Sequence, residues 1–262
     1  MAIQLNQRDY LIFQLLVEHT VLLEKHIAWF VAHEEKPVLI RDRLRKLFYL
    51  DYLLCQRYDN KLSWWTTPTK PLVYMLAPLA ASMAGSKTPN IDTSDTNQQK
   101  KYLEIANIRM IFLIAQTKGI VQNFKWTTCG SANNGYILDA VISCDSKSAS
   151  YNLGLLCHPV IDRDLLAKIE KEMIEKKITN IMIVCGDQTH QVDLQKLLTG
   201  SKILSDKTVF AVHQDLYKNG IDKVLWLSAT RQPVKFLGQS NTISVTAPGP
   251  GQSQIFTDVH AA

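Results

Sequence analysis

Cysteines and long hydrophobic runs are scarce in this sequence. Only five cysteines occur among 262 residues, they are widely spread, and no two form a Cys-x-x-Cys pair. This pattern argues against a secreted disulfide framework and a zinc cluster, and it favours a reducing compartment. Charged residues make up 20% of the chain and hydrophobic residues 46%, which is typical of a folded protein and argues against collagen, coiled-coil rods and general disorder.

No stretch of about 18 uncharged apolar residues is present, so the sequence predicts no membrane-spanning helix. The first residues, MAIQLNQRDY, lack the basic start, the apolar core and the cleavage site of a signal peptide. We therefore expect a cytoplasmic protein. At about 150 residues per domain, the length of the chain favours two domains.

The positive charge is concentrated in one segment. Residues 36–70 carry eight basic and three acidic side chains, whereas residues 1–35 carry two basic and five acidic ones. The net charge of the whole chain is only +5. A basic segment of this kind is a candidate surface for nucleic acid.

Residues 1–83 show the pattern of three short helices followed by a β-hairpin. Asn6 is a suitable N-cap for the first helix, and Pro37 is a favourable first residue for the third. Residues 53–58 and 71–76 are β-prone and are separated by a polar connector. These elements predict a winged helix-turn-helix domain. Apolar residues recur at helical spacing in the three segments: Leu11, Ile12, Leu15 and Leu16; Leu23, Ile27, Phe30 and Val31; Ile40, Leu44 and Leu47.

This part of the chain resembles the N-terminal winged helix of the replication-relaxation family, which includes plasmid replication proteins and mobilisation relaxases. The resemblance lies in LNQRDYLIFQLL, VLLEKHIAWFV, RDRLRKLFYLDYLLCQRYDN and VYMLAPLA. The best matches are the R-L-R-K-L core that starts at Arg43 and the Y-x-L-x-P pattern that starts at Tyr74. The stretch YLEIANIRMIFLIA resembles the helix that follows the linker in this family.

We expect residues 84–99 to form a flexible linker, because Ile91 is their only large apolar residue. Residues 100–245 alternate helical and strand-like segments, and the Pro/Gly/Gln-rich residues 246–262 are expected to be a mobile tail. The predicted strands are residues 136–142, 151–157, 180–185, 209–212 and 223–227, with helices from about 100, over about 162–177 and around Leu194. This order predicts an α/β sandwich around a mixed sheet, so the fold class is α/β overall. It also resembles the restriction-nuclease-like domain of the same family.

A nuclease of this type needs a cluster of carboxylates to hold a divalent ion. By the resemblance, Asp139 occupies the position of the first acid, with Leu138 in place of the usual proline. The next strand should supply an acid pair or an acid and a lysine, yet residues 151–157 contain no carboxylate and no lysine. We therefore expect a degenerate site in which Asp139 is vestigial and serves as a capping or solvent-facing carboxylate. The nearby acids that could replace the pair are Asp145, Asp162 and Asp164.

Other catalytic patterns are weaker. His19, His26 and His33 are seven residues apart but lie on two predicted helices, so we predict no metal site there. Cys157 and His158 are adjacent, and neighbouring side chains of a strand point to opposite faces, so no Cys/His pair is expected. The segment GSANNG lacks the Lys-Ser/Thr of a phosphate-binding loop. We expect no cofactor and no bound metal.

In a helix-turn-helix, basic residues of the third helix and of the wing contact DNA. The predicted DNA contacts are Arg41, Arg43, Arg45 and Lys46 on the third helix and Arg57 and Lys61 on the wing. The alternative is that these charges merely form the solvated face of a surface helix. Trp64 and Trp65 follow on the wing as two adjacent indoles, which are either exposed and bind a protein partner or packed against the second domain.

Two functions follow from these expectations. The first is a non-catalytic accessory protein of plasmid replication or conjugative mobilisation that binds double-stranded DNA. The alternative is an adaptor that contacts protein subunits of a conjugation-derived (type IV) secretion or coupling complex. An active nuclease is the weakest option. The sequence leaves the oligomeric state open.

Overall fold

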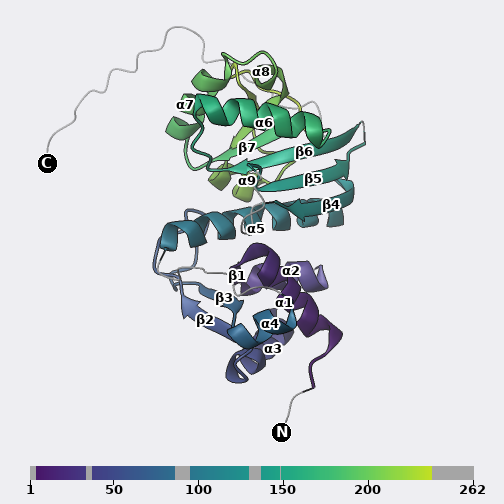
Figure 1. Cartoon of the computed structure of the whole chain (residues 1–262), viewed down its shortest axis with the longest axis vertical. Coiled ribbons are helices and arrows are strands. Elements are labelled where there is room, and N and C mark those ends of the chain that lie inside the picture. Colours follow the sequence, from purple (N-terminus) through teal and green to yellow (C-terminus); the bar gives the residue numbers. More distant parts are fainter. Residues whose placement is uncertain (1–3, 34–36, 86–94, 130–136, 148, 238–262) are drawn as a thin grey trace, which may run out of the picture.

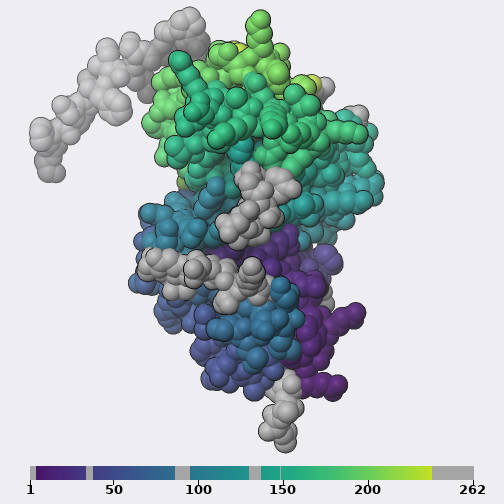
Figure 2. Space-filling view, viewed as in Figure 1, coloured from purple at the N-terminus to yellow at the C-terminus, as the bar shows by residue number. Residues whose placement is uncertain are grey.

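The computed structural model describes residues 4–33, 37–85, 95–129, 137–147 and 149–237. Within these residues the chain is a mixed α/β protein with nine helices and two sheets. Figure 1 shows a small N-terminal unit and a larger C-terminal unit, with one long helix running between them. In the space-filling view the two units form two lobes of one continuous body (Figure 2). Among the described helices, none combines the length and apolar composition that crossing a bilayer requires.

The N-terminal unit combines three helices with a small antiparallel sheet. The sheet has the order β1-β3-β2, and a short helix, α4, follows β3. A buried core of aliphatic and aromatic side chains joins the three helices to the sheet. The bounds of these elements are α1 (Gln7–His19), β1 (Leu22–Leu23), α2 (Glu24–Ala32), α3 (Pro37–Tyr49), β2 (Leu53–Arg57), β3 (Leu72–Leu76) and α4 (Pro78–Met83).

Local sequence signals explain where the helices begin and end. At the start of α1, the Asn6 side chain accepts a hydrogen bond from the Asp9 amide at 3.1 Å. The Asp9 carboxylate in turn accepts one from the Asn6 amide at 2.8 Å, which completes a capping box. Thr20 and His33 have positive φ angles of 70° and 54° and end α1 and α2. The third helix was expected to begin at Pro37, and it does.

Residues 58–71 connect β2 to β3 and fold back on the protein. Tyr58, Leu62 and Trp64 are at most 3% exposed and form a separate core cluster. Leu103 of the long helix belongs to the same cluster, so the connector is held against the centre of the molecule. A polar connector was expected to project as a wing, whereas its three large apolar side chains bury much of it.

The long helix α5 (Thr96–Thr117) belongs to the cores of both units. Ala106 and Met110 pack into the core of the N-terminal unit, whereas Ile108 and Phe112 pack against the large sheet. Its N-cap is Asp95, whose carboxylate accepts hydrogen bonds from two backbone amides. Residues 96–99, expected in the linker, are therefore helical, while residues 86–94 lie outside the described residues. The expected tail, residues 246–262, also lies outside them.

The C-terminal unit contains a six-stranded sheet in the order β4-β5-β6-β7-β8-β9. Neighbours from β4 to β6 are antiparallel, those from β6 to β8 are parallel, and β9 is antiparallel to β8. The strands are β4 (Gln122–Thr128), β5 (Ala140–Asp145), β6 (Ser150–Cys157), β7 (Asn180–Cys185), β8 (Thr208–Val212) and β9 (Leu227–Ser228).

Helices cover both faces of this sheet (Figure 1). Helices α5 and α9 pack on one face and helices α6, α7 and α8 on the other. Strand β7 is buried on both sides, with Met182 and Val184 facing α5 and Ile181 and Ile183 facing the opposite helices. The remaining helices are α6 (Arg163–Glu175), α7 (Gln188–Leu198), α8 (Leu204–Lys207) and α9 (His213–Asn219).

The predicted strand at residues 180–185 is confirmed, and two others differ. The strand expected at 136–142 begins only at Ala140 and continues to Asp145. In the segment expected as a strand at 223–227, only Leu227 belongs to a strand. The residues before it form a turn, which the buried Trp226 closes by donating a hydrogen bond through Nε1 to the Ile221 carbonyl at 3.1 Å. Strand β4 was not predicted, since it is an edge strand whose seven residues are exposed or half-buried.

A polar contact ties α1 to α5 and β4. The Arg109 guanidinium on α5 donates hydrogen bonds to the Glu18 carboxylate at 2.8 Å and to His19 Nε2 at 2.7 Å. Thr128 of β4 donates to the same carboxylate at 2.8 Å. Burial and then the charge of Arg109 hold the pKa of His19 well below its ordinary value. The histidine is therefore neutral and fixes the N-terminal unit to α5.

Candidate functional site

Five of the six predicted DNA contacts lie on the protein surface, and four of these five form no hydrogen-bonded ion pair with a described residue. Lys46, Arg57 and Lys61 are exposed, and none of them forms an ion pair with a described residue. Arg45 is 59% exposed, and its guanidinium lies 3.8 Å from the Asp42 carboxylate, which is too far for a hydrogen bond. Helix α3, which carries two of the four, lies at the end of the molecule away from the large sheet (Figure 1).

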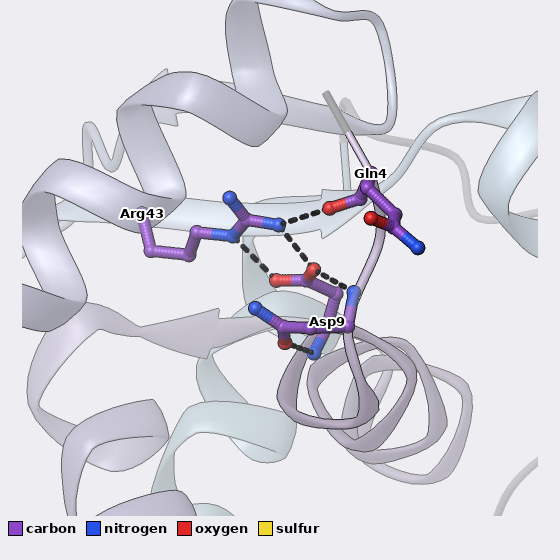
Figure 3. A network of polar contacts seen from close by, with 4 residues as sticks. Gln4, Asp9 and Arg43 are labelled. Atoms are coloured by element: carbon purple, nitrogen blue, oxygen red, sulfur yellow. Dashed lines mark hydrogen bonds and ion pairs between the residues drawn. The ribbon is translucent and has the colours of Figure 1, made fainter. Parts of the chain in front are cut away.

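Arg43 points inward, so its prediction as a DNA contact is wrong. Its Nε donates a hydrogen bond to Asp9 Oδ1 at 2.6 Å, and its Nη2 forms an ion pair with the other oxygen of Asp9 (Figure 3). Asp9 is fully buried, and Arg43 also donates to the Gln4 carbonyl at 3.5 Å. A buried carboxylate requires a charged partner. Arg43 therefore links α3 to α1 and points away from the exposed face of the helix.

Arg41 is exposed but already paired. Its Nε and Nη2 atoms donate to the Glu24 carboxylate at 2.9–3.1 Å. The guanidinium is still 54% exposed, and the contact with Glu24 raises its pKa. Because Glu24 is the first residue of α2, the pair fixes α3 relative to α2 and neutralises part of the predicted positive surface.

Of the two alternatives for the adjacent tryptophans, exposure is excluded for Trp64. Trp64 is 2% exposed, and its ring centroid lies 5.9 Å from that of His26 and 5.4 Å from that of Tyr217. The packing alternative holds for this indole, since Tyr217 belongs to α9 of the C-terminal unit. Trp65 is half-buried, and its Nε1 donates a hydrogen bond to the Thr69 carbonyl at 2.7 Å. Both indoles therefore stabilise the connector.

A cavity of about 670 Å³ lies between α2, β2 and the connector. Its lining is rich in cations, but three of the four are engaged: Lys25 contacts the Tyr217 hydroxyl at 2.5 Å, Arg41 contacts Glu24, and Lys70 contacts Asp59 at 2.7 Å. Arg41 and Lys70 are paired with carboxylates, whereas Lys25 contacts a neutral hydroxyl and, like Arg57, forms no ion pair with a described residue. Two of the four cations therefore keep a positive charge that no described acid balances.

A second group of polar residues is buried where the parallel strands end. His158 follows β6, Gly186 follows β7 and His213 is the first residue of α9 after β8. Helix α5 faces these positions with Glu104 and Asn107, both at most 2% exposed. Ligands bind at the carboxyl ends of parallel strands in many α/β proteins. The sequence analysis did not predict this group, although Glu104 and Asn107 interrupt the apolar residues in the middle of α5 and were a signal for it.

Asp139 lies beside this group and is neither a cap nor exposed to solvent. It is 6% exposed, forms an ion pair with Lys101 Nζ at 2.8 Å and accepts a hydrogen bond from the Cys157 amide at 2.7 Å. Burial raises its pKa, and Lys101 acts in the opposite direction. The acids considered as replacements are used elsewhere: Asp145 lies at the far end of β5, and Asp162 caps α6 with Asp164 in its first turn. No described carboxylate pair accompanies Asp139.

Cys157, His158 and Glu104 converge, contrary to the expectation from strand alternation. A carboxylate oxygen of Glu104, the Cys157 sulfur and a ring nitrogen of His158 all lie within 4.8 Å of one another. The His158 Nε2 atom is 3.0 Å from Glu104 Oε2. Burial would raise the pKa of Glu104, but the hydrogen bond from His158 and neighbouring positive charges lower it overall. His158 has a φ of 49°, which removes it from the regular alternation of β6.

Comparisons with protein-family models, with curated proteins and with solved structures find no match to this chain.

Proposed function

We propose that this chain is a non-catalytic accessory protein that binds double-stranded DNA through α3 and the β2–β3 hairpin, including its connector, of a winged helix-turn-helix. The observation that carries the proposal is the set of exposed cations on these elements, namely Arg45, Lys46, Arg57 and Lys61. Cations of this kind bind the phosphate backbone and release its counterions. A role in plasmid replication or conjugative mobilisation rests on the sequence resemblance described above.

The arrangement of α3 supports this proposal. Its apolar residues Ile40, Leu44 and Leu47 are buried, so the opposite face is turned away from the core. An α-helix fits the major groove, and α3 lies at the end of the molecule away from the large sheet (Figure 1). Its outward face would reach base edges, while Arg57 and Lys61 would contact phosphates beside it.

The C-terminal unit supports a non-catalytic role. The order α5-β4-β5-β6-α6-β7 agrees with the restriction-nuclease-like fold suggested by the sequence. The carboxylate that would begin a nuclease site, Asp139, is buried against Lys101. A single acid that is already neutralised by a lysine is poorly suited to hold a catalytic magnesium ion. All five cysteines are free, in keeping with the expected cytoplasmic location.

Fluorescence anisotropy with a random duplex of about 30 base pairs, at low and moderate salt, tests this function. Lys46→Ala and Arg57→Ala should each weaken binding and lower the salt slope by about one ion per lost phosphate contact. Lys202→Ala is the matched control, since Lys202 is an exposed lysine beyond α7 in the other unit. Full affinity in both test variants, or equal loss in the control, would overturn the proposal.

One observation favours a protein-adaptor function as the second candidate. Four large apolar side chains near the two ends of α3 are exposed: Val38 and Leu39 at 64% each, Phe48 at 41% and Tyr49 at 74%. Exposed apolar and aromatic residues are typical of protein interaction surfaces. If the protein fails to bind DNA at low salt, this adaptor function, with a subunit of a conjugation-derived complex as partner, becomes the first candidate.

A further inference from the structure

We propose that Glu104, Cys157 and His158 form a binding site for a zinc-class divalent metal ion. Their three ligand atoms lie within 4.8 Å of one another. Around a tetrahedral zinc ion, ligands at about 2.0–2.3 Å from the metal are about 3.3–3.7 Å apart. The Glu104 oxygen and the His158 nitrogen are already 3.0 Å apart, so only small movements are needed for all three to reach one ion.

The backbone is built to bring these side chains together. Cys157 ends β6, and its amide is fixed by the Asp139 carboxylate at 2.7 Å. His158 then adopts a left-handed conformation with a φ of 49°, which is uncommon for a residue other than glycine. Such backbone conformations are concentrated at functional sites. Both side chains consequently approach Glu104 on α5.

Gly186 makes room for the histidine. A Cβ atom at this position would lie 2.8 Å from His158 Nδ1, which is closer than side-chain packing permits. The absence of a side chain after β7 therefore allows the imidazole to lie over the ends of the strands. Its Nε2 atom is left directed at Glu104.

The ligand types select the class of metal. Thiolate, imidazole and carboxylate together suit zinc and related transition metals, whereas magnesium and calcium prefer sites made only of oxygen atoms. Binding breaks the S–H bond of Cys157, forms a sulfur–metal bond and releases the proton to solvent. The two anionic ligands then balance the charge of a divalent ion, so the buried site becomes neutral.

The position of the site allows an ion to enter and to act on the fold. Glu104 and Cys157 are at most 2% exposed, but the His158 side chain is 21% exposed and forms the outer wall. Three protein ligands leave a fourth position for water or another ligand. An ion bound here joins α5, which contributes to the cores of both units, to the end of β6.

Titration of the metal-stripped, reduced full-length chain with Co²⁺ tests the proposal, because cobalt replaces zinc and reports its ligands by absorption. We expect one ion per chain, a thiolate-to-cobalt band in the near ultraviolet and the strong visible bands of tetrahedral coordination, all lost when Zn²⁺ is added. Cys157→Ser should abolish the ultraviolet band. Cys144→Ala is the matched control, since Cys144 is a buried cysteine at the other end of the sheet and should leave the spectrum unchanged.

His158→Asn and Glu104→Gln should weaken Co²⁺ binding at least about tenfold, in line with the loss of one of three ligands. Asparagine tolerates a positive φ, and His158 is partly exposed, so this variant tests the site even if Cys157→Ser fails to fold. Absence of a thiolate band in the wild-type chain, its loss in Cys144→Ala, or unchanged affinity in His158→Asn would each overturn the proposal. The DNA-binding proposal does not depend on this result.

Discussion

The surface of α3 and the interior along α5 use polar residues in opposite ways. On α3, Arg45 and Lys46 project from a helix whose apolar face is buried, so their charge remains available to a ligand. Along α5, Lys101, Glu104 and Arg109 meet partners supplied by the other elements. The difference is that the charges on α3 remain in contact with solvent, whereas the charges along α5 are fixed by partners on other elements.

Acid should affect the interior most strongly, because three of its histidines are kept neutral. Burial and then the charge of Lys25 lower the pKa of His26 to about 3, and burial also lowers the pKa of His19 and lowers that of His213 to about 4. Such groups stabilise the fold fully above their unfolded pKa of about 6.5, and this stability is lost as the pH falls below it. We expect the free energy of unfolding to fall by about 1.4 kcal/mol per pH unit for each histidine.

Urea denaturation between about pH 7 and pH 5 measures this slope. His26→Gln should lower this slope by the amount that corresponds to the uptake of about one proton on unfolding, whatever its effect on stability at neutral pH. His33→Gln is the control, because His33 is exposed at the end of α2 and should leave the slope unchanged. Equal slopes in the wild type and in His26→Gln would show that the buried histidine does not resist protonation.

A buried ion pair also exists within the N-terminal unit, and breaking it should have the next largest effect. Asp9→Asn leaves the Arg43 guanidinium, of which only 19% is exposed, without its charged partner. We expect the free energy of unfolding to fall by about 3 kcal/mol, since removal of one member of a buried pair leaves the other uncompensated. Urea denaturation at neutral pH measures this change.

The exposed pair of Arg45 and Asp42 on the same helix provides the control. Asp42→Asn should change stability by less than about 0.5 kcal/mol, because both side chains are more than half exposed. A loss in Asp9→Asn as small as this would mean that Figure 3 shows an incidental contact. Arg43→Met should keep normal affinity for DNA once the variant is folded, in contrast to Lys46→Ala.

These contrasts show how far the sequence predicts the molecule. Helix periodicity and capping located α1, α3 and the buried face of α3, because such signals are local. The partner of Arg43 could not be predicted, since Asp9 lies 34 positions away and the contact depends on helix packing. The sequence left open whether Trp64 is exposed or packed against the second unit, because it does not show that the connector folds onto α2 and α9.

The candidate metal ligands were missed for a similar reason. Spacing rules detect ligands that are close in sequence, whereas Glu104 is more than fifty positions before Cys157 and lies on another element. Strand alternation also predicted that the side chains of Cys157 and His158 point to opposite faces of the sheet. The positive φ of His158 breaks this alternation and brings the two side chains together. Glu104 and Asn107, which interrupt the apolar residues in the middle of α5, were the one signal that the sequence contained.

The smallest expected effect concerns the boundary of the DNA-binding surface. Glu24→Gln removes the acid that neutralises Arg41, and the freed guanidinium could then contact a phosphate. We expect DNA affinity to rise by about threefold and the salt slope to rise by about one, as measured by anisotropy. Glu175→Gln on α6 is the control, since Glu175 is an exposed, ion-paired glutamate far from α3. If Lys46→Ala weakens DNA binding while Glu24→Gln leaves the affinity unchanged, Arg41 serves only to hold α2 to α3 and does not belong to the proposed DNA-binding surface.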